Sequence, residues 1–163
     1  MLIVGVDCGL HGAASIYDAE NHTVLDIIDL PTEAWGTKRH MDIPPLLRWV
    51  HRWRADTAAI ERVNAMPSID GKRSMGAASA FRFGMIFGEI RGALVGAGLK
   101  TIDVPPSVWK DLFELNKRPK DDARLLAIKL HPEIAEQLKR KKDQGRAEAI
   151  LVARWAALNR HEH

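Results

Sequence analysis

Three acidic residues stand out because each one interrupts an apolar run. Asp7 lies near the end of the β-rich stretch 2–8, and Glu61 holds the same position in the stretch 58–63. Glu148 lies within an apolar helical run near the carboxyl end of the chain. A buried carboxylate is costly unless a partner balances its charge. Three carboxylates from separate buried elements therefore predict a shared hard divalent cation, which prefers oxygen ligands.

The elements that must position these acids follow from the local patterns. Strands are expected at 1–8, 13–17 and 23–30, and their short connections predict an antiparallel meander. The remaining order predicts a mixed sheet with helices on its faces. Its elements are strands at 57–63 and 100–104, and helices at 43–53, 74–97, 106–115, 120–130, 132–139 and 144–159.

The bulk composition bounds the class of protein. A chain of 163 residues, 46% apolar and 28% charged, fits one soluble domain over 1–163 with a sizeable core. Its single cysteine, Cys8, excludes an internal disulfide framework and favours a reducing cytoplasm. The longest apolar stretch, 77–99, contains Arg82, Glu89 and Arg91, so we expect no membrane span.

Four segments, in this order along the chain, resemble RuvC-type Holliday junction resolvases of the ribonuclease H-like superfamily, above all the bacteriophage-like members. They are 3–14 (IVGVDCGLHGAA), 59–63 (AIERV), 104–110 (VPPSVWK) followed by 117–124, and 142–149 (KDQGRAEA). Each segment alone is weak, whereas the ordered set spans nearly the whole chain.

The resemblance implies a fold and an activity. The fold is a ribonuclease H-like mixed five-stranded sheet, three antiparallel strands followed by parallel strands, flanked by helices. The activity is that of a crossover junction endodeoxyribonuclease, which as a homodimer resolves four-way DNA junctions by paired nicks in DNA recombination or repair. It implies two Mg²⁺ ions per site, with Mn²⁺ as a substitute and no small-molecule cofactor, and products with a 5′ phosphate and a 3′ hydroxyl. The expected location is the cytoplasm of a bacterial or phage-infected cell.

The resemblance also assigns the metal ligands, with one departure. Asp7, Glu61 and Glu148 match the acidic positions, whereas the usual second acid of the last motif is replaced by Gly145. The nearest preceding acid is Asp143, and five residues on a helix rotate by about 140°. Asp143 is therefore expected to join the metal site only if it lies before the helix proper. The alternatives are a helix N-cap, for which aspartate is well suited, and a surface salt bridge with the basic run 139–142 just before it.

Basic residues cluster around these motifs. The resemblance places Lys120 at the scissile phosphate as a catalytic residue, and Lys120 also follows Pro119 near a helix start, where backbone N–H groups favour phosphate. The alternative for each basic residue is a solvated surface role. The full expected DNA-binding set is Lys72, Arg73, Lys110, Lys117, Arg118, Lys120, Lys141 and Lys142.

Glycine recurs at every fourth position of the expected helix 74–97, at Gly84, Gly88, Gly92 and Gly96. Each glycine costs a helix about 0.8–1 kcal/mol relative to alanine, so the stripe implies close backbone approach. The approach is either to the sheet of the same chain or, as the resemblance supports, to a second copy across a two-fold axis.

Two other functions remain open. One is a ribonuclease of the same fold that processes structured RNA. The other is a non-catalytic nucleic-acid-binding domain, although mere binding gives no use for the desolvation cost of three buried acids.

Overall fold

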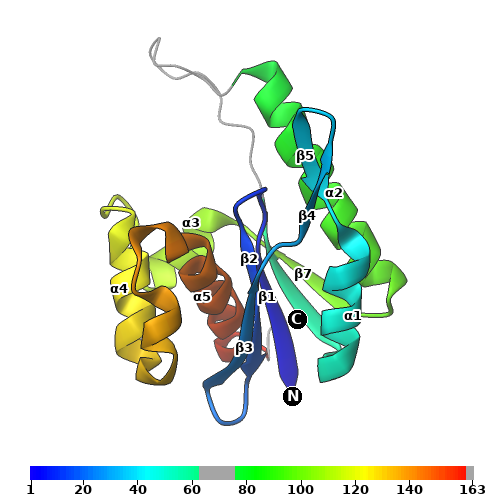
Figure 1. The fold of residues 1–163 in the computed structure, drawn as a ribbon. Helices are drawn as coiled ribbons and strands as arrows, with labels where there is room; N and C mark the ends of the chain where they lie inside the picture. The colour runs from blue at the N-terminus through cyan, green and yellow to red at the C-terminus, as the bar shows by residue number, and fades with distance from the viewer. Residues whose placement is uncertain (63–75, 161–163) are drawn as a thin grey trace.

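The computed structural model describes residues 1–62 and 76–160, and its centre is a five-stranded sheet (Figure 1). The strand order is β3-β2-β1-β6-β7, with β1 antiparallel to β2, β2 antiparallel to β3, and β1, β6 and β7 parallel. The mixed sheet predicted from the sequence is confirmed. The strands are β1 (Leu2–Asp7), β2 (Ala13–Asp18), β3 (Thr23–Asp29), β6 (Thr57–Glu61) and β7 (Lys100–Val104).

Helices cover both faces of this sheet, and each face has its own apolar core (Figure 1). Two helices pack on one face: α1 (Ile43–Trp53) and α2 (Ala77–Gly96). The other face carries α3 (Pro106–Leu112), α4 (Asp121–Leu130), α5 (Gln144–Leu158) and the short 3₁₀ turns Pro132–Leu138 and Lys141–Asp143. Within the described ranges, no helix is long and apolar enough to cross a membrane.

Helix α5 lies directly against β1 because Gly5 has no side chain. A Cβ added at Gly5 would overlap the carbonyl oxygen of Ala149 and lie 2.7 Å from the Cβ of Ala153. The Ser15 hydroxyl of β2 donates to the same Ala149 carbonyl at 3.1 Å. Small residues on both sides therefore bring the helix that carries Glu148 close to the strand that carries Asp7.

A two-stranded hairpin between β3 and α1 was not predicted. Strands β4 (Thr32–Trp35) and β5 (Lys38–Met41) pair antiparallel around a two-residue turn at Gly36, whose φ is 62°. In the sequence, Gly36 is the residue that could have indicated this hairpin, since two-residue hairpin turns require a positive φ at the first central position. The strands themselves are short, polar and mostly exposed, so they lack the apolar alternation of a half-buried strand.

The largest boundary error concerns α3, which was expected to continue to 115. The helix ends at Leu112, and Glu114 adopts a left-handed conformation with φ 54°. Glu114 N–H then donates to the Asp111 carbonyl at 3.1 Å, which closes a turn and sends the chain toward α4.

Candidate metal centre

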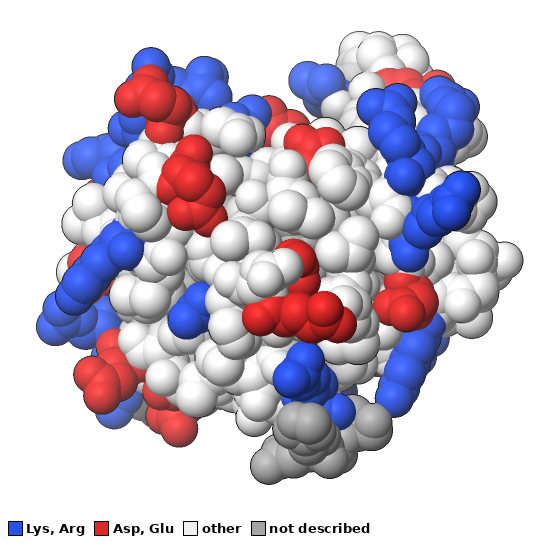
Figure 2. Space-filling view, turned by 90° about the horizontal axis from the view of Figure 1, so that it is seen from below, with Lys and Arg blue, Asp and Glu red and all other residues white. Residues whose placement is uncertain are grey.

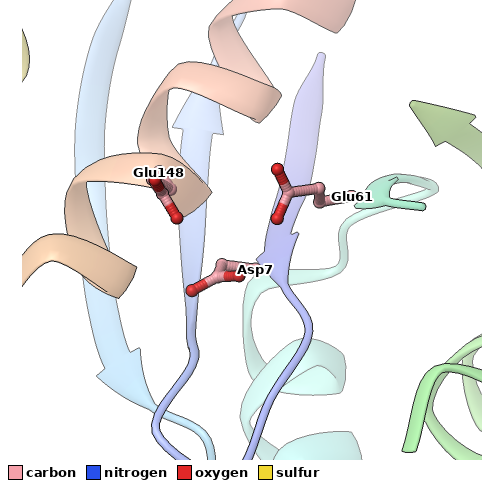
Figure 3. Close-up of side chains that lie close together, drawn as sticks. All are labelled: Asp7, Glu61 and Glu148. Atoms are coloured by element: carbon pink, nitrogen blue, oxygen red, sulfur yellow. The ribbon is translucent and has the colours of Figure 1, made fainter. Parts of the chain in front are cut away.

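Strand register places the first two acids side by side. Strands β1 and β6 are parallel, and Val6 is paired with Ile60, so the next residues are Asp7 and Glu61. Helix α5 crosses the same end of β1 and adds Glu148. One carboxylate oxygen from each acid lies within 4.8 Å of the others, and the three side chains converge (Figure 3). The structure thus unites the three acids singled out in the sequence.

The electrostatics of this cluster call for a cation. Burial, followed by the charges of Glu148 and Glu61 and a hydrogen bond to Glu61, holds the pKa of Asp7 well above its usual range. Burial and the charge of Glu61 likewise raise the pKa of Glu148. Three half-buried carboxylates therefore repel one another at neutral pH. A hard divalent cation offsets this repulsion, and an all-oxygen donor set is the one it prefers.

Two neutral side chains orient the acids. The indole N–H of Trp109, a fully buried residue of α3, donates to Glu61 Oε1 at 3.0 Å. The amide of Gln144 donates to Glu148 Oε1 at 3.0 Å from one turn earlier on α5. Sequence reasoning missed both roles. For Gln144 the i,i+4 spacing to Glu148 was a usable signal, whereas the contact between Trp109 and Glu61 depends on tertiary packing alone.

Asp143 does not join this cluster. Its buried carboxylate accepts hydrogen bonds from Arg140, through Nη2 at 2.6 Å and through the backbone N–H at 2.9 Å. The Arg140 guanidinium, as the first cause, lowers the pKa of Asp143. Asp143 also makes no side-chain cap bond to α5, although it directly precedes that helix. The structure shows neither metal-ligand nor N-cap geometry for Asp143. The remaining alternative is present instead: Asp143 forms an ion pair with Arg140 of the preceding basic run, which closes the Lys141–Asp143 turn.

The packing around Gly145 explains why this chain has no acid at position 145, where the resembling motif has its second acid. A Cβ added at Gly145 would lie 2.8 Å from Asp7 Oδ2 and 3.0 Å from the His11 carbonyl oxygen. The first turn of α5 therefore rests against Asp7, and a larger residue at position 145 would displace it. Among the described residues, the candidate metal site consists of three carboxylates.

The structure brings two of the expected basic residues to the acids. Burial and the neighbouring acids raise the pKa of Glu148 and of Asp7, and the charge of Lys110 partly offsets this increase at both acids, as that of Lys120 does at Glu148. Lys110 Nζ lies 5.0 Å from the centroid of the Trp109 ring.

The other expected DNA-binding residues are more dispersed. Lys117, Lys141 and Lys142 are exposed, while Arg118 is exposed and forms an ion pair with Asp122 at 2.9 Å. The pKa of Asp121 in α4 is lowered, first by the hydrogen bond from Arg124 and to a smaller extent by the charge of Lys141. Lys72 and Arg73 lie outside the described residues, so their role stays a prediction.

Comparison with known proteins identifies the fold. No protein-family model matches the sequence. A structure of T. thermophilus RuvC in complex with a Holliday junction substrate superimposes with a TM-score of 0.63 at 15% identity, over 99% of this chain and 96% of that one. A further Thermus thermophilus RuvC structure gives a TM-score of 0.56 at 14% identity, over the same shares of the two chains. The chain therefore has the RuvC-type, ribonuclease H-like fold.

A sequence relative points in the same direction. The chloroplastic Holliday junction resolvase MOC1 of Chlamydomonas reinhardtii is 39% identical over 70 residues, which cover 42% of this chain. The match spans only 8% of the length of that relative.

Proposed function

We propose that this protein is a metal-dependent endonuclease that resolves four-way DNA junctions by paired nicks. The observation that carries the proposal is the cluster of Asp7, Glu61 and Glu148 at one end of a RuvC-type sheet. The similarity to the MOC1 resolvase and to the structure of RuvC with a junction supports DNA junctions as the substrate. A half-buried acidic cluster in which burial and neighbouring charges raise the pKa values of Asp7 and Glu148 is typical of a catalytic centre.

The three carboxylates are proposed to hold two Mg²⁺ ions, with Mn²⁺ as a substitute. Bound ions of this kind supply an activated water and stabilise charge on the attacking and leaving oxygens of an in-line displacement at phosphorus. Trp109 and Gln144 fix the orientation of the ligands Glu61 and Glu148 through their N–H groups. The expected products have a 5′ phosphate and a 3′ hydroxyl.

Lys110 and Lys120 are proposed to hold the scissile phosphate. The charges of both ammonium groups partly offset the burial and the Glu61 charge that raise the pKa of Glu148, and Lys120 directly precedes α4, whose first-turn N–H groups favour an anion. A positive charge beside the phosphate favours the more negatively charged transition state. Lys120 therefore acts on the rate more than on binding.

The DNA is proposed to lie across the carboxyl ends of β1 and β6, where the acids are. Figure 2 shows the opposite face, at the amino ends of these strands. Lys and Arg gather mainly at the two sides of that face, while Asp, Glu and uncharged side chains occupy most of its middle. Since duplex binding depends on cations that follow the phosphates, this opposite face is a poor DNA surface.

A homodimer is proposed to form through the glycine stripe of α2. A Cβ added at Gly84, Gly88, Gly92 or Gly96 would meet nothing within 4 Å, and all four glycines are exposed. This geometry disfavours packing against the chain's own sheet as the reason for the stripe. A second copy would use the bare backbone for close approach, and a two-fold enzyme matches a junction with two equivalent strands to cut.

The test is cleavage of a synthetic four-way junction and of a linear duplex with the same sequences, with and without Mg²⁺. We expect paired nicks in the junction alone, only with the metal, and none from Glu61→Gln. An RNA hairpin is tested in parallel, and its preferential cutting would instead assign a ribonuclease. Junction binding without cleavage under Mg²⁺ or Mn²⁺ would assign a binding domain. The proposed setting is the cytoplasm, in a single domain over 1–163.

A further inference from the structure

A concave surface lies between the β4–β5 hairpin and α2. The β4–β5 hairpin and the amino-terminal half of α2 enclose a groove of about 370 Å³, and they stand next to each other in Figure 1. Leu10 of the β1–β2 turn also lines the groove, only three residues after Asp7. One end of the groove therefore touches the turn that follows Asp7 in the chain.

The polar lining of this groove is strongly biased toward positive charge. Lys38 and Arg39 come from the hairpin, and Arg82 comes from α2. His40 adds a further hydrogen-bonding side chain, and among the described residues that line the groove the only acid is Glu89. Such a surface is complementary to an anion.

The same groove offers exposed apolar and aromatic surface. Phe81 and Met85 line it from α2, and the Phe81 residue is 71% exposed. Trp35 lies at the tip of the hairpin, next to the groove and not among its lining residues, and is paired with the lining residue Lys38. It is 62% exposed and stacks on the His40 ring, with centroids 4.5 Å apart and planes inclined by 27°. His40 covers one face of the exposed indole by stacking, and the indole can stack with a further planar ring, such as a base.

We propose that this groove binds an unpaired DNA strand, with phosphates on Lys38, Arg39 and Arg82 and a base stacked on Trp35. Proteins that bind single strands combine a basic groove with aromatic platforms in this way. A volume of about 370 Å³ fits one small ligand such as a nucleotide, and a double helix is too wide to enter. The inference rests on the proposed function, which supplies branched DNA as the ligand; the groove would take a strand that is opened where the four arms meet.

The experiment measures binding of a fluorescent oligothymidine of about 12 nucleotides by anisotropy at several salt concentrations. All proteins carry Asp7→Asn, so that no strand is cut. The groove variant is Lys38→Ala with Arg82→Ala. The matched control, Arg52→Ala with Lys129→Ala, also removes one arginine and one lysine, but from exposed positions on α1 and α4. A third protein carries Trp35→Ala.

We expect the groove variant to lower the log–log salt slope by about 1.4, from two lost phosphate contacts on a single strand. Trp35→Ala should weaken binding by about 5- to 150-fold, the usual effect of losing one base–aromatic stack. The control should match the parent protein. Equal losses in the groove variant and the control, or no loss in either, would overturn the groove.

Two further readouts keep this proposal separate from the proposed function. Cleavage of the junction by the wild-type protein with Mg²⁺ judges the nuclease alone, whatever the groove variants do. A change in self-association of the groove variant, with unchanged strand binding, would assign the groove to a second copy of the chain and overturn the DNA site.

Discussion

The indole of Trp109 donates its only hydrogen bond to Glu61, at 3.0 Å from Oε1, and thereby couples α3 to the acid at the end of β6. Trp109 is fully buried, so its ring cannot swing away from this contact. Because an indole nitrogen only donates, the bond is made to an ionised acceptor and holds the Glu61 carboxylate in one orientation. Lys110, the next residue along α3, lies beside the same ring.

Trp109→Phe tests this coupling, since it keeps an aromatic ring and removes the N–H group. We expect junction cleavage to fall by about 10- to 100-fold, as is usual when a hydrogen bond to a metal ligand is lost. Trp53→Phe is the matched control, because it removes an indole bond to Asp26 at 3.2 Å on the other face of the sheet. Single-turnover cleavage at saturating protein gives the comparison, and equal effects of the two variants would make Trp109 a packing residue only.

Asp7→Asn should abolish cleavage and yet stabilise the metal-free protein at neutral pH. The folded pKa of Asp7 is raised, so its contribution to stability is fully present below the unfolded pKa near 3.8 and is lost as pH rises through the folded pKa. Asparagine removes this penalty, and each kcal/mol of stability raises the Tm by about 2–4 °C in a chain of this size.

Thermal unfolding with and without Mg²⁺ completes this test. A ligand that binds only the folded state stabilises it by about 2.7 kcal/mol at a hundred times its Kd. The wild type should show such a gain and Asp7→Asn should lose most of it. Asp56→Asn, at an exposed position, serves as control and should respond to the metal like wild type. A full metal response in Asp7→Asn would place the metal elsewhere.

Asp143→Asn should leave cleavage intact and lower stability. The Arg140 guanidinium lowers the folded pKa of Asp143, so the stabilisation is present above the unfolded pKa and is lost as pH falls through the folded pKa. Losing a charged acceptor costs about 1.5–3 kcal/mol, and the half-exposed Arg140 places the expected value at the lower end. Urea unfolding at pH 7 measures it. Loss of cleavage with unchanged stability would restore Asp143 to the metal site.

His131 should make the fold less stable below neutral pH. Burial lowers its pKa, against the opposing effect of Glu133, while the charges of Arg154 and His22 lower it further. Its Nε2 atom is buried without a partner among the described groups. The stability contributed by the neutral ring is present above the unfolded pKa near 6.5 and is lost as pH falls toward the folded pKa.

The measurement is the free energy of unfolding of wild type and His131→Gln at pH 7.5 and pH 5.5, both about one unit from the ordinary histidine pKa. The difference between the two proteins isolates His131 from Asp7 and Glu148, whose raised pKa values act with the opposite sign. An identical pH dependence in both proteins would show that His131 does not titrate differently on folding.

Gly88 distinguishes a subunit interface from a merely exposed helix. Gly88→Ala should stabilise the isolated chain by about 0.8–1 kcal/mol, because the new Cβ meets nothing within 4 Å. Gly88→Leu should weaken self-association by pushing two helices apart. Sedimentation compares it with Lys129→Leu, which adds a leucine to the exposed face of α4. A wild type that sediments as a monomer at micromolar concentration would contradict the dimer.

Local pattern determined most of the scaffold. Apolar runs ending in Asp7 and Glu61 specified two strands, and the helical run around Glu148 specified the last helix, because burial periodicity is a property of neighbouring residues. The sequence therefore predicts that Asp7, Glu61 and Glu148 share a site, while the register of β1 and β6 and the packing of α5 bring them within reach of one another. The hairpin 32–41 was missed because its exposed polar strands leave no such periodicity.

Only the tertiary structure decided the contacts between distant segments. The sequence around Asp143 suits a metal ligand, a helix cap or an ion pair. Arg140 binds this carboxylate in the structure, because the fold decides which of the possible partners lies within reach. Trp109 reaches Glu61 only because α3 packs over the end of β6. The outward direction of the glycines around Gly88 follows from which face of α2 covers the sheet. Spacing alone fixes which residues share a helix face, and packing alone fixes what that face meets.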